Sequence, residues 1–343
     1  MPFQYLQNNY YGPGPGPVKY YLNDLNLKSK ISIIGYQDIV GHYNLTGLGI
    51  EKAIDILEKQ KNDYIIFCGC DHPSDNLHTQ INQLRDAFEK KLFAITGNGN
   101  FINQEKWIFY FPYYWYAFLP GPQQGYKPWI KKFTNFNKSR PYPASCLNNL
   151  CRLHRIQLFD KLVEKPYFSL ILYSMNSNEA NDYYDDPVMQ HLISKHKTKL
   201  PIFLDRTNYD YGNDMLLLSH PGLHDSYLNI VTENHRNANF ISEKIFKPIA
   251  CGQFFIILGG AGVIELLRKL GFDTFDDIIN HDYDKESDPD LRLQQLVSSV
   301  DDFMQLNHIK VWDATLQRRL DNATHFFNLD ITQNPFRNFL ANL

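Results

Sequence analysis

The stretch IVTENHRNANFISEKIFKPIACGQFFIILGGAG, residues 230–262, decides the fold that the sequence predicts. Its pattern indicates a strand, a loop, a helix, a buried-type strand and a glycine-rich loop. Ser242 or Asn239 is expected to cap the helix, which puts the Glu243 carboxylate into the first turn, where the helix dipole favours it. Backbone N–H groups and Lys244 would then gather at the end of a parallel sheet. That arrangement suits a phosphorylated ligand.

These residues resemble the donor-binding motif of the α-1,3-fucosyltransferase family and of related sugar transferases from bacteria and large viruses. In the family, a Glu-Asn-Ser segment precedes an aromatic-aliphatic-Thr-Glu-Lys segment, a helix and a strand. The matching residues here are Glu233, Asn234, Phe240, Glu243, Lys244 and Gly252.

The stretch also departs from the family pattern at His235, Ser242 and Phe254, where Ser, Thr and Pro are usual. The resemblance covers about a tenth of the chain and points to a sugar transferase more than to fucose. It implies an α/β fold in which two Rossmann-like domains face a cleft, the arrangement called GT-B.

The composition is that of a soluble globular protein, and 343 residues suffice for two α/β domains. A net charge of −3 gives no indication of nucleic acid or an anionic membrane as the main partner. No apolar run of about 18 residues predicts a membrane span, and Met1 to Gly16 lacks the apolar core of a secretory signal. The odd number of cysteines, 5, favours buried reduced thiols and a cytoplasmic location.

Strand and helix patterns alternate twice along the chain, which predicts parallel sheets covered by helices. The expected strands are 30–36, 64–68, 92–96, 107–111, 144–148, 168–173, 216–219, 227–232 and 254–258. The expected helices, besides the one in the motif, are 48–60, 77–92, 154–164, 264–270, 291–306 and 311–329.

A linker is expected within residues 112–143, which are rich in Pro, Gly, Tyr and Lys. The predicted domains are therefore an acceptor-side α/β domain over residues 1–140 and a donor-binding α/β domain over residues 141–310. Residues 311–343 are expected to form a C-terminal helical segment, for which a return to the first domain stays open.

Two arginines near the start of the second domain are candidates for the donor diphosphate. The resemblance places an arginine at a helix start here, and Arg155 is the better match, with Arg152 second. A guanidinium fork suits phosphate oxygens, and the helix N-terminus adds its dipole. The alternative is an exposed arginine paired with a nearby carboxylate.

The motif supplies the other donor-binding candidates. Lys244 is expected at the phosphates, and Glu243 at a ribose or sugar hydroxyl. Glu233 and Asn234 either touch the sugar or brace their loop. Arg236 is otherwise unexplained and is a candidate for a third phosphate contact. The glycine cluster that includes Gly259 and Gly260 is interpreted as a tight turn near the donor.

An inverting transfer needs a base for the acceptor hydroxyl, and residues that follow strands of the first domain are the candidates. Asp71 is the first choice, His72 the second and Asp38 the third. A turn-closing role for Asp71 before a proline is the competing interpretation. The acidic runs 185–186 and 282–284 are interpreted as solvated loops.

The sequence therefore predicts an inverting glycosyltransferase that needs no metal or cofactor and uses a GDP- or UDP-linked sugar. Its acceptor would be a glycan, a lipid-linked sugar or a protein, and peripheral membrane contact stays open. The alternatives are a retaining GT-B transferase and a catalytically silent module that binds nucleotide or sugar.

Overall fold

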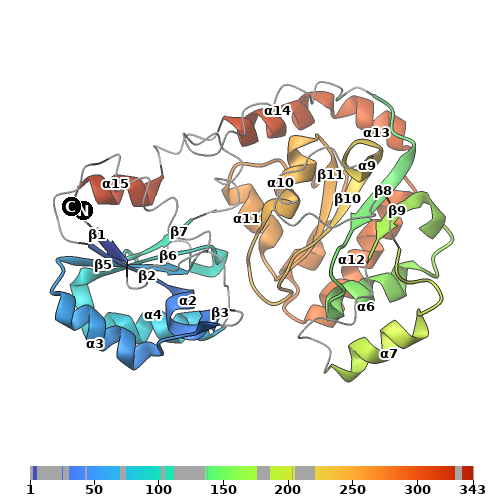
Figure 1. Ribbon diagram of the computed structural model, residues 1–343. Helices are drawn as coiled ribbons and strands as arrows, with labels where there is room; N and C mark the ends of the chain where they lie inside the picture. Colours follow the sequence, from blue (N-terminus) through green and yellow to red (C-terminus); the bar gives the residue numbers. More distant parts are fainter. Residues whose placement is uncertain are drawn as a thin grey trace. The chain divides into compact units, whose positions relative to one another are not determined.

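The computed structural model describes residues 3–5, 25, 31–42, 45–69, 75–101, 105–111, 136, 138–175, 186–202, 204, 221–328 and 334–342. The chain divides into two compact units, which are described separately below (Figure 1). Unit 1 comprises Met1–Ala117, Ala238–Phe240 and Asp330–Leu343; unit 2 comprises Phe118–Asn237 and Ile241–Leu329. The domain boundary expected at residue 140 stays a prediction, because most of the expected linker lies outside the described residues.

Unit 1 is built on a parallel sheet of five strands in the order β1-β2-β5-β6-β7. Apolar runs such as that of β5, which is buried at five of its six positions, explain why the sheet is covered on both faces. The strands are β1 Phe3–Tyr5, β2 Ile31–Gly35, β5 Tyr64–Gly69, β6 Leu92–Thr96 and β7 Ile108–Tyr110.

The two faces of this sheet pack against different helices (Figure 1). Ile34 and Phe67 belong to a cluster with α3 and α4. Alternation along the strand turns Ile33 to the opposite face, where Phe336 and Leu340 of α15 pack. The chain's last described helix therefore belongs to the unit that its first strands build. The remaining elements are α2 Tyr36–Val40, β3 Gly41–His42, β4 Leu45–Thr46, α3 Ile50–Gln60, α4 Asp75–Phe88, η1 Glu89–Lys91, η2 Gly99–Phe101 and α15 Pro335–Ala341.

Unit 2 is built on a parallel sheet of four strands in the order β11-β10-β8-β9. β10 lies at the centre and is buried along its whole length, with Asn229 opposite Phe255 on one side and Ser145 on the other. The strands are β8 Tyr142–Leu147, β9 Ile171–Ser174, β10 Ser226–Thr232 and β11 Phe254–Leu258.

The helices of unit 2 lie on both faces of its sheet (Figure 1). α6 packs with α7 and α12, whereas α10 packs with α14. The ring of Phe246 in α10 stacks on the ring of Phe326 in α14, with centroids 5.6 Å apart. The helices are α6 Leu153–Leu162, η4 Phe168–Leu170, α7 Pro187–Lys195, α9 Pro221–His224, α10 Glu243–Ala250, α11 Val263–Lys269, η5 Asp282–Lys285, α12 Pro289–Met304, α13 His308–Ala314 and α14 Leu316–Phe327.

The α/β class and the parallel sheets expected from the sequence are confirmed. Three details were wrong or missing. The strand expected over 168–173 begins only at Ile171, after the turn of η4. The single helix expected over 311–329 is interrupted at Thr315, and its two parts stay in unit 2. The strand β1 and the helix α7 were not predicted, whereas α15 lies within the segment 311–343 that was expected to be helical. The strand expected over 216–219 lies outside the described residues.

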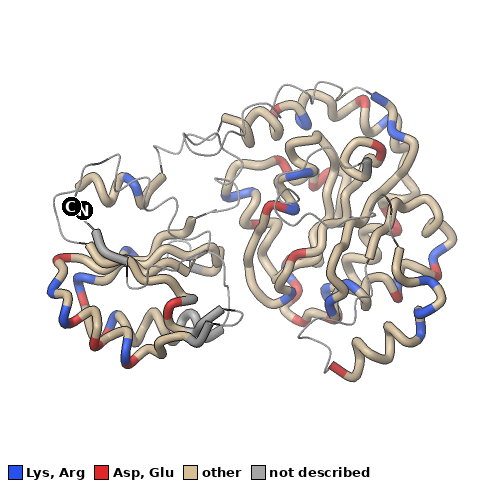
Figure 2. The backbone as a smooth tube through the Cα atoms, in the orientation of Figure 1, with Lys and Arg blue, Asp and Glu red and all other residues tan. Residues whose placement is uncertain are grey.

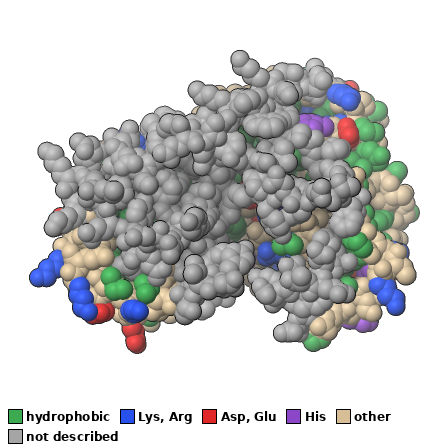
Figure 3. Space-filling view, in the orientation of Figure 1, with side chains coloured by type: hydrophobic (Ala, Val, Ile, Leu, Met, Phe, Trp, Pro, Cys, Tyr) green, Lys and Arg blue, Asp and Glu red, His purple; other side chains and the backbone are tan. Residues whose placement is uncertain are grey.

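The described surface carries both signs of charge. The outer side of α3 carries both acidic and basic residues, and Figure 2 shows both signs spread over each unit. In the space-filling view the charged side chains of unit 1 that are visible lie along its lower edge (Figure 3). None of the helices that the structure describes has the length and apolarity needed to traverse a bilayer.

Candidate functional site

The carboxyl end of the unit 2 sheet brings the motif of residues 230–262 next to the start of α6. The strands β8 and β10 are neighbours, yet the chain proceeds from β8 to β9 on one side and from β10 to β11 on the other. Parallel α/β sheets take their ligands beyond the carboxyl ends of the strands at such a reversal of direction. The segments after β8 and β10 flank this position.

Glu233, the first residue after β10, joins that strand to the start of α10. Its side chain is fully buried. Its two carboxylate oxygens accept hydrogen bonds from the Ser242 backbone N–H at 2.8 Å and from the Ser242 hydroxyl at 2.6 Å. These contacts favour the loop-bracing alternative for Glu233. Ser242 also caps α10, because its hydroxyl oxygen accepts from the Lys244 N–H at 3.3 Å, which confirms Ser242 rather than Asn239 as the N-cap.

Glu243 and Lys244 form an ion pair in the first turn of α10. The Lys244 Nζ lies 3.3 Å from Glu243 Oε1 and 3.9 Å from Glu233 Oε2. Burial raises the pKa of the Glu243 carboxyl, but Lys244 and Lys247 outweigh burial, so that this pKa is lowered. At Glu233 burial prevails and raises the pKa of the carboxyl against the influence of Lys244. The pKa of Glu243 is thus below its usual value and that of Glu233 above it, and Glu243 remains 12% exposed.

Arg155 lies buried in the first turn of α6 and points toward the end of β10. Its guanidinium donates to the carbonyl oxygens of Leu150 at 2.9 Å and Thr232 at 3.3 Å, and to Asn234 Oδ1 at 3.2 Å. Burial lowers the pKa of Arg155 to about 10, and the neighbouring Arg152 adds to this effect. Within the described part of the chain, no carboxylate lies within ion-pair distance of Arg155, and its Nε has no hydrogen-bond partner. The expected alternative, an exposed arginine paired with an acid, does not fit these contacts.

The start of α6 is further tied to the motif by two neighbours of Arg155. Arg152, the N-cap residue, donates through Nη1 to the Asn234 carbonyl oxygen at 2.8 Å, and its side chain does not cap the helix. His154 Nε2 lies 2.8 Å from the Glu233 carbonyl oxygen. Burial and the adjacent Arg155 lower the pKa of His154 to about 3, so the neutral ring donates to that carbonyl. His154 was not predicted as a site residue, because a lone histidine on a helix carries no sequence pattern.

The glycine cluster after β11 is shaped by packing. A Cβ on Gly259 would meet Val263 Cγ1 at 3.2 Å and Glu233 Cβ at 3.6 Å, so a small residue lets the ends of β10 and β11 approach each other. The Gly259 carbonyl oxygen accepts from Arg292 Nε at 3.0 Å. Gly260 is buried beside it. The tight turn expected here is present.

The N–H groups at the start of α11 are already bound by Asp284, a residue that was expected to lie in a solvated loop. Asp284 is buried, and its carboxylate accepts from the N–H groups of Ile264 at 3.0 Å and Glu265 at 3.1 Å. The expectation of a solvated loop is wrong for Asp284, because the carboxylate satisfies helix N–H groups from a distant segment. Asp186 is likewise an N-cap, of α7, with its carboxylate 2.8 Å from the Val188 N–H. A phosphate near the glycine turn would have to compete with Asp284 for the N–H groups at the start of α11.

Of the candidates expected in the first domain, the structure describes only Asp38. Asp38 follows β2 in unit 1, is buried, and accepts from the Gly35 N–H at 2.6 Å. Burial raises the pKa of its carboxyl. Asp71 and His72 lie outside the described residues.

Comparisons with known proteins give a fold likeness only. No protein-family model matches the chain, and no curated protein is similar to it in sequence. Spinosyn rhamnosyltransferase SpnG is similar over 96% of this chain and 78% of its own, with 10% identity and a TM-score of 0.36. A putative UDP-N-acetylglucosamine 2-epimerase from Listeria monocytogenes is similar over 99% of this chain and 93% of its own, with 9% identity and a TM-score of 0.39. At these TM-scores the likeness carries no argument about function.

Proposed function

We propose that the chain is a glycosyltransferase of the GT-B type, which transfers a sugar from a nucleotide-sugar donor to an acceptor hydroxyl. The observation that carries the proposal is the buried Arg155 guanidinium at the start of α6. It is held by oxygen atoms of uncharged groups and adjoins Asn234 of the motif. A buried charge without a counter-ion is costly, and an anionic ligand would compensate it.

Two further features support a diphosphate as that anion. α6 begins without a side-chain cap, so its first N–H groups and its dipole favour a phosphate. Glu233 Oε2 lies 3.9 Å from Lys244 Nζ, and the Glu233 charge opposes the lowering of the Arg155 pKa, so this carboxylate is near both cations. Arg155 and Lys244 would neutralise the leaving diphosphate from the two segments that follow β8 and β10.

The sugar part of the proposal rests on Glu243. Its ionised, partly exposed carboxylate is an acceptor for vicinal hydroxyls of a ribose or hexose. Both carboxylate oxygens of Glu233, by contrast, already accept hydrogen bonds from Ser242. The same proposal includes three further points: the transfer inverts the configuration of the sugar, it needs no metal, and it takes place in the cytoplasm. Arginine, lysine and the helix dipole would take the part that a metal ion plays elsewhere.

A thermal-shift and calorimetry screen of the full chain with GDP, UDP, ADP, CMP and dTDP tests the proposal. A nucleotide present at a concentration of about 100 times its dissociation constant adds roughly 2.7 kcal/mol to the stability of the folded protein. One nucleoside diphosphate is expected to bind with much higher affinity than the other nucleotides. The sugar conjugate of that nucleotide is expected to be consumed when a glycan acceptor is present. Absence of binding to every nucleotide contradicts the proposal. Tight binding without transfer or donor hydrolysis instead favours the silent binding module.

A further inference from the structure

Arg236 lies in the loop of the motif, and its backbone and its side chain are held by different partners. Its carbonyl oxygen accepts from Arg292 Nη2. Arg292 is buried in α12 and also donates to the carbonyl oxygens of Gly259 at 3.0 Å and Glu286 at 2.6 Å. The backbone at Arg236 is thereby anchored to the same guanidinium as the glycine turn.

The side chain of Arg236 is held much less firmly. Its Nη1 donates to Gln157 Oε1 at 3.2 Å and to Asp290 Oδ1 at 3.4 Å, and 28% of the side chain remains exposed. Gln157 Nε2 donates to the same Asp290 oxygen at 3.4 Å, so the three groups close a ring of long hydrogen bonds. An ion pair of this exposure and length is weak.

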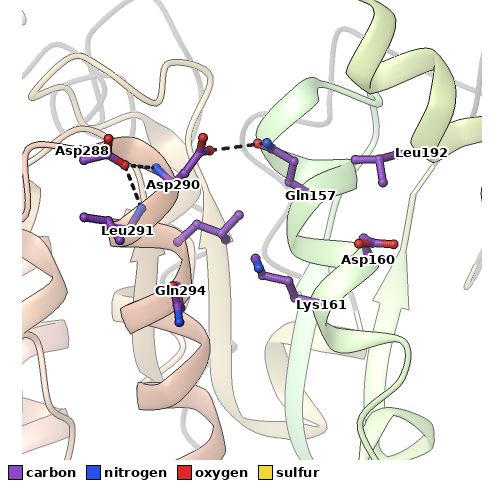
Figure 4. A pocket seen from close by; sticks show the side chains of 9 residues that line it. Gln157, Asp160, Lys161, Leu192, Asp288, Asp290, Leu291 and Gln294 are labelled. Atoms are coloured by element: carbon purple, nitrogen blue, oxygen red, sulfur yellow. Dashed lines mark hydrogen bonds between the residues drawn. The ribbon is translucent and has the colours of Figure 1, made fainter.

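Gln157 and Asp290 stand on opposite walls of a pocket between α6 and α12. The pocket has a volume of about 500 Å³, and in Figure 4 these two side chains reach toward each other across it. Their carboxylate and amide groups draw Arg236 toward the pocket. Gln157 lies on the same helix, α6, as Arg155, and the charges of Arg155, Arg152 and Arg236 all help to lower the pKa of His154.

We propose that Gln157 and Asp290 form a resting latch for Arg236, which the donor diphosphate opens by drawing the guanidinium onto its phosphate oxygens. This inference rests on the proposed function, because the competing ligand is the nucleoside diphosphate. The fixed backbone of Arg236 acts as the pivot, and its long side chain changes partner. Asp290 and Gln157 are positioning residues that lower donor affinity by competing for Arg236.

Calorimetry with the nucleoside diphosphate found in the screen tests the latch. Asp290→Asn and Gln157→Met are each expected to raise affinity about two- to fivefold, the factor for release of an exposed ion pair. Arg236→Ala is expected to lower affinity roughly tenfold or more, as for a charged hydrogen bond. The corresponding nucleoside monophosphate should show smaller changes, since a purely structural effect would alter both ligands alike.

The double variant Arg236→Ala/Asp290→Asn separates the latch from a general charge effect. It is expected to bind the nucleoside diphosphate with the affinity of Arg236→Ala alone. Without the guanidinium, Asp290 no longer competes with the diphosphate for a partner. Overturning results are an unchanged or weakened affinity in Asp290→Asn, or a gain of the same size in the Arg236→Ala background. If the unaltered protein binds no nucleoside diphosphate, the proposed function itself fails, whereas binding that ignores these substitutions removes only the latch.

Discussion

Ser242 holds both oxygens of the Glu233 carboxylate, one through its backbone N–H and one through its hydroxyl. The two residues are nine positions apart, at the end of β10 and the N-cap of α10. The contact closes the connection between strand and helix, and it orients the first turn that carries Glu243 and Lys244. The serine that departs from the family pattern keeps the hydroxyl that this bond requires.

Ser242→Ala should lower the free energy of unfolding by about 1–2 kcal/mol, because it removes a helix cap and a hydrogen bond to a buried carboxylate. Urea unfolding measures the change. Ser298→Ala is the matched control, since the Ser298 hydroxyl makes an exposed bond to the Gln294 carbonyl oxygen at 3.3 Å. Equal effects of the two substitutions would show that the Glu233–Ser242 contact contributes nothing particular.

Arg155→Lys and Lys244→Ala should each weaken nucleoside-diphosphate binding by about 1.5–3 kcal/mol, the range for charged hydrogen bonds. Lysine at position 155 keeps the charge but loses the fork, so the first substitution tests geometry. Lys269→Ala removes the same charge from the exposed last turn of α11 and should leave binding unchanged. Calorimetry that finds normal affinity in both site variants would rule out Arg155 and Lys244 as the contacts of the diphosphate.

Glu243→Gln should reduce affinity for the donor with little change in melting temperature, because the amide keeps the shape of the carboxylate without its charge. Glu265→Gln is a fitting control, since Glu265 also lies in the first turn of a helix and is exposed. If Glu243→Gln unfolds the protein while its folded fraction binds donor normally, Glu243 has a structural role.

His281 should make unit 2 sensitive to acid. Burial lowers the pKa of His281 to about 4, and the neutral ring accepts from Tyr283 Oη at 3.1 Å through Nδ1 while Nε2 donates to the Thr274 carbonyl oxygen at 2.9 Å. In the unfolded chain the ring takes up its proton near pH 6.5. The unfolded state therefore binds more protons between pH 6.5 and 4, and stability is full above this window and falls as the pH drops through it. Urea unfolding of His281→Gln should show a flatter pH dependence over that range; an unchanged slope would contradict the assignment.

Much of the fold was predictable because the strands carry continuous apolar runs and the helices carry apolar stripes. β10 and β11 illustrate this, and Ser242 followed by Glu243 marked the helix start between them. Contacts between distant segments left no local pattern. The burial of Asp284 depends on its reach to the start of α11, and the neutral state of His154 depends on its burial beside Arg155.

The donor candidates show the same limit. Strand-end position and residue type selected Arg155 and Lys244, and the structure places both near Glu233. The assignment of Glu233 to sugar or to loop needed its hydrogen bonds, because a carboxylate after a strand serves either purpose. Arg292 was missed, since a buried arginine that binds carbonyl oxygens looks like any helical arginine in the sequence.

The choice of catalytic base yields the last prediction. Asp38 already accepts from the Gly35 N–H at 2.6 Å, so it closes the turn between β2 and α2. Asp71 follows β5, the central strand of unit 1, and remains our candidate for the base. Asp71→Asn should leave donor binding intact and lower transfer by roughly 10²–10⁴-fold, the usual contribution of a positioned base. Asp38→Asn should instead lower the melting temperature, with the transfer rate of its folded fraction close to normal.

Transfer rate, donor affinity and melting temperature, measured on both variants, distinguish these roles. His72→Ala belongs in the same series and should cost less than Asp71→Asn, mainly through the Michaelis constant for the acceptor. A fully active Asp71→Asn enzyme would remove Asp71 from catalysis and promote His72. Asp38 would replace both if its substitution abolished transfer while melting temperature and donor affinity stayed unchanged, because its bond to Gly35 would then be dispensable for folding.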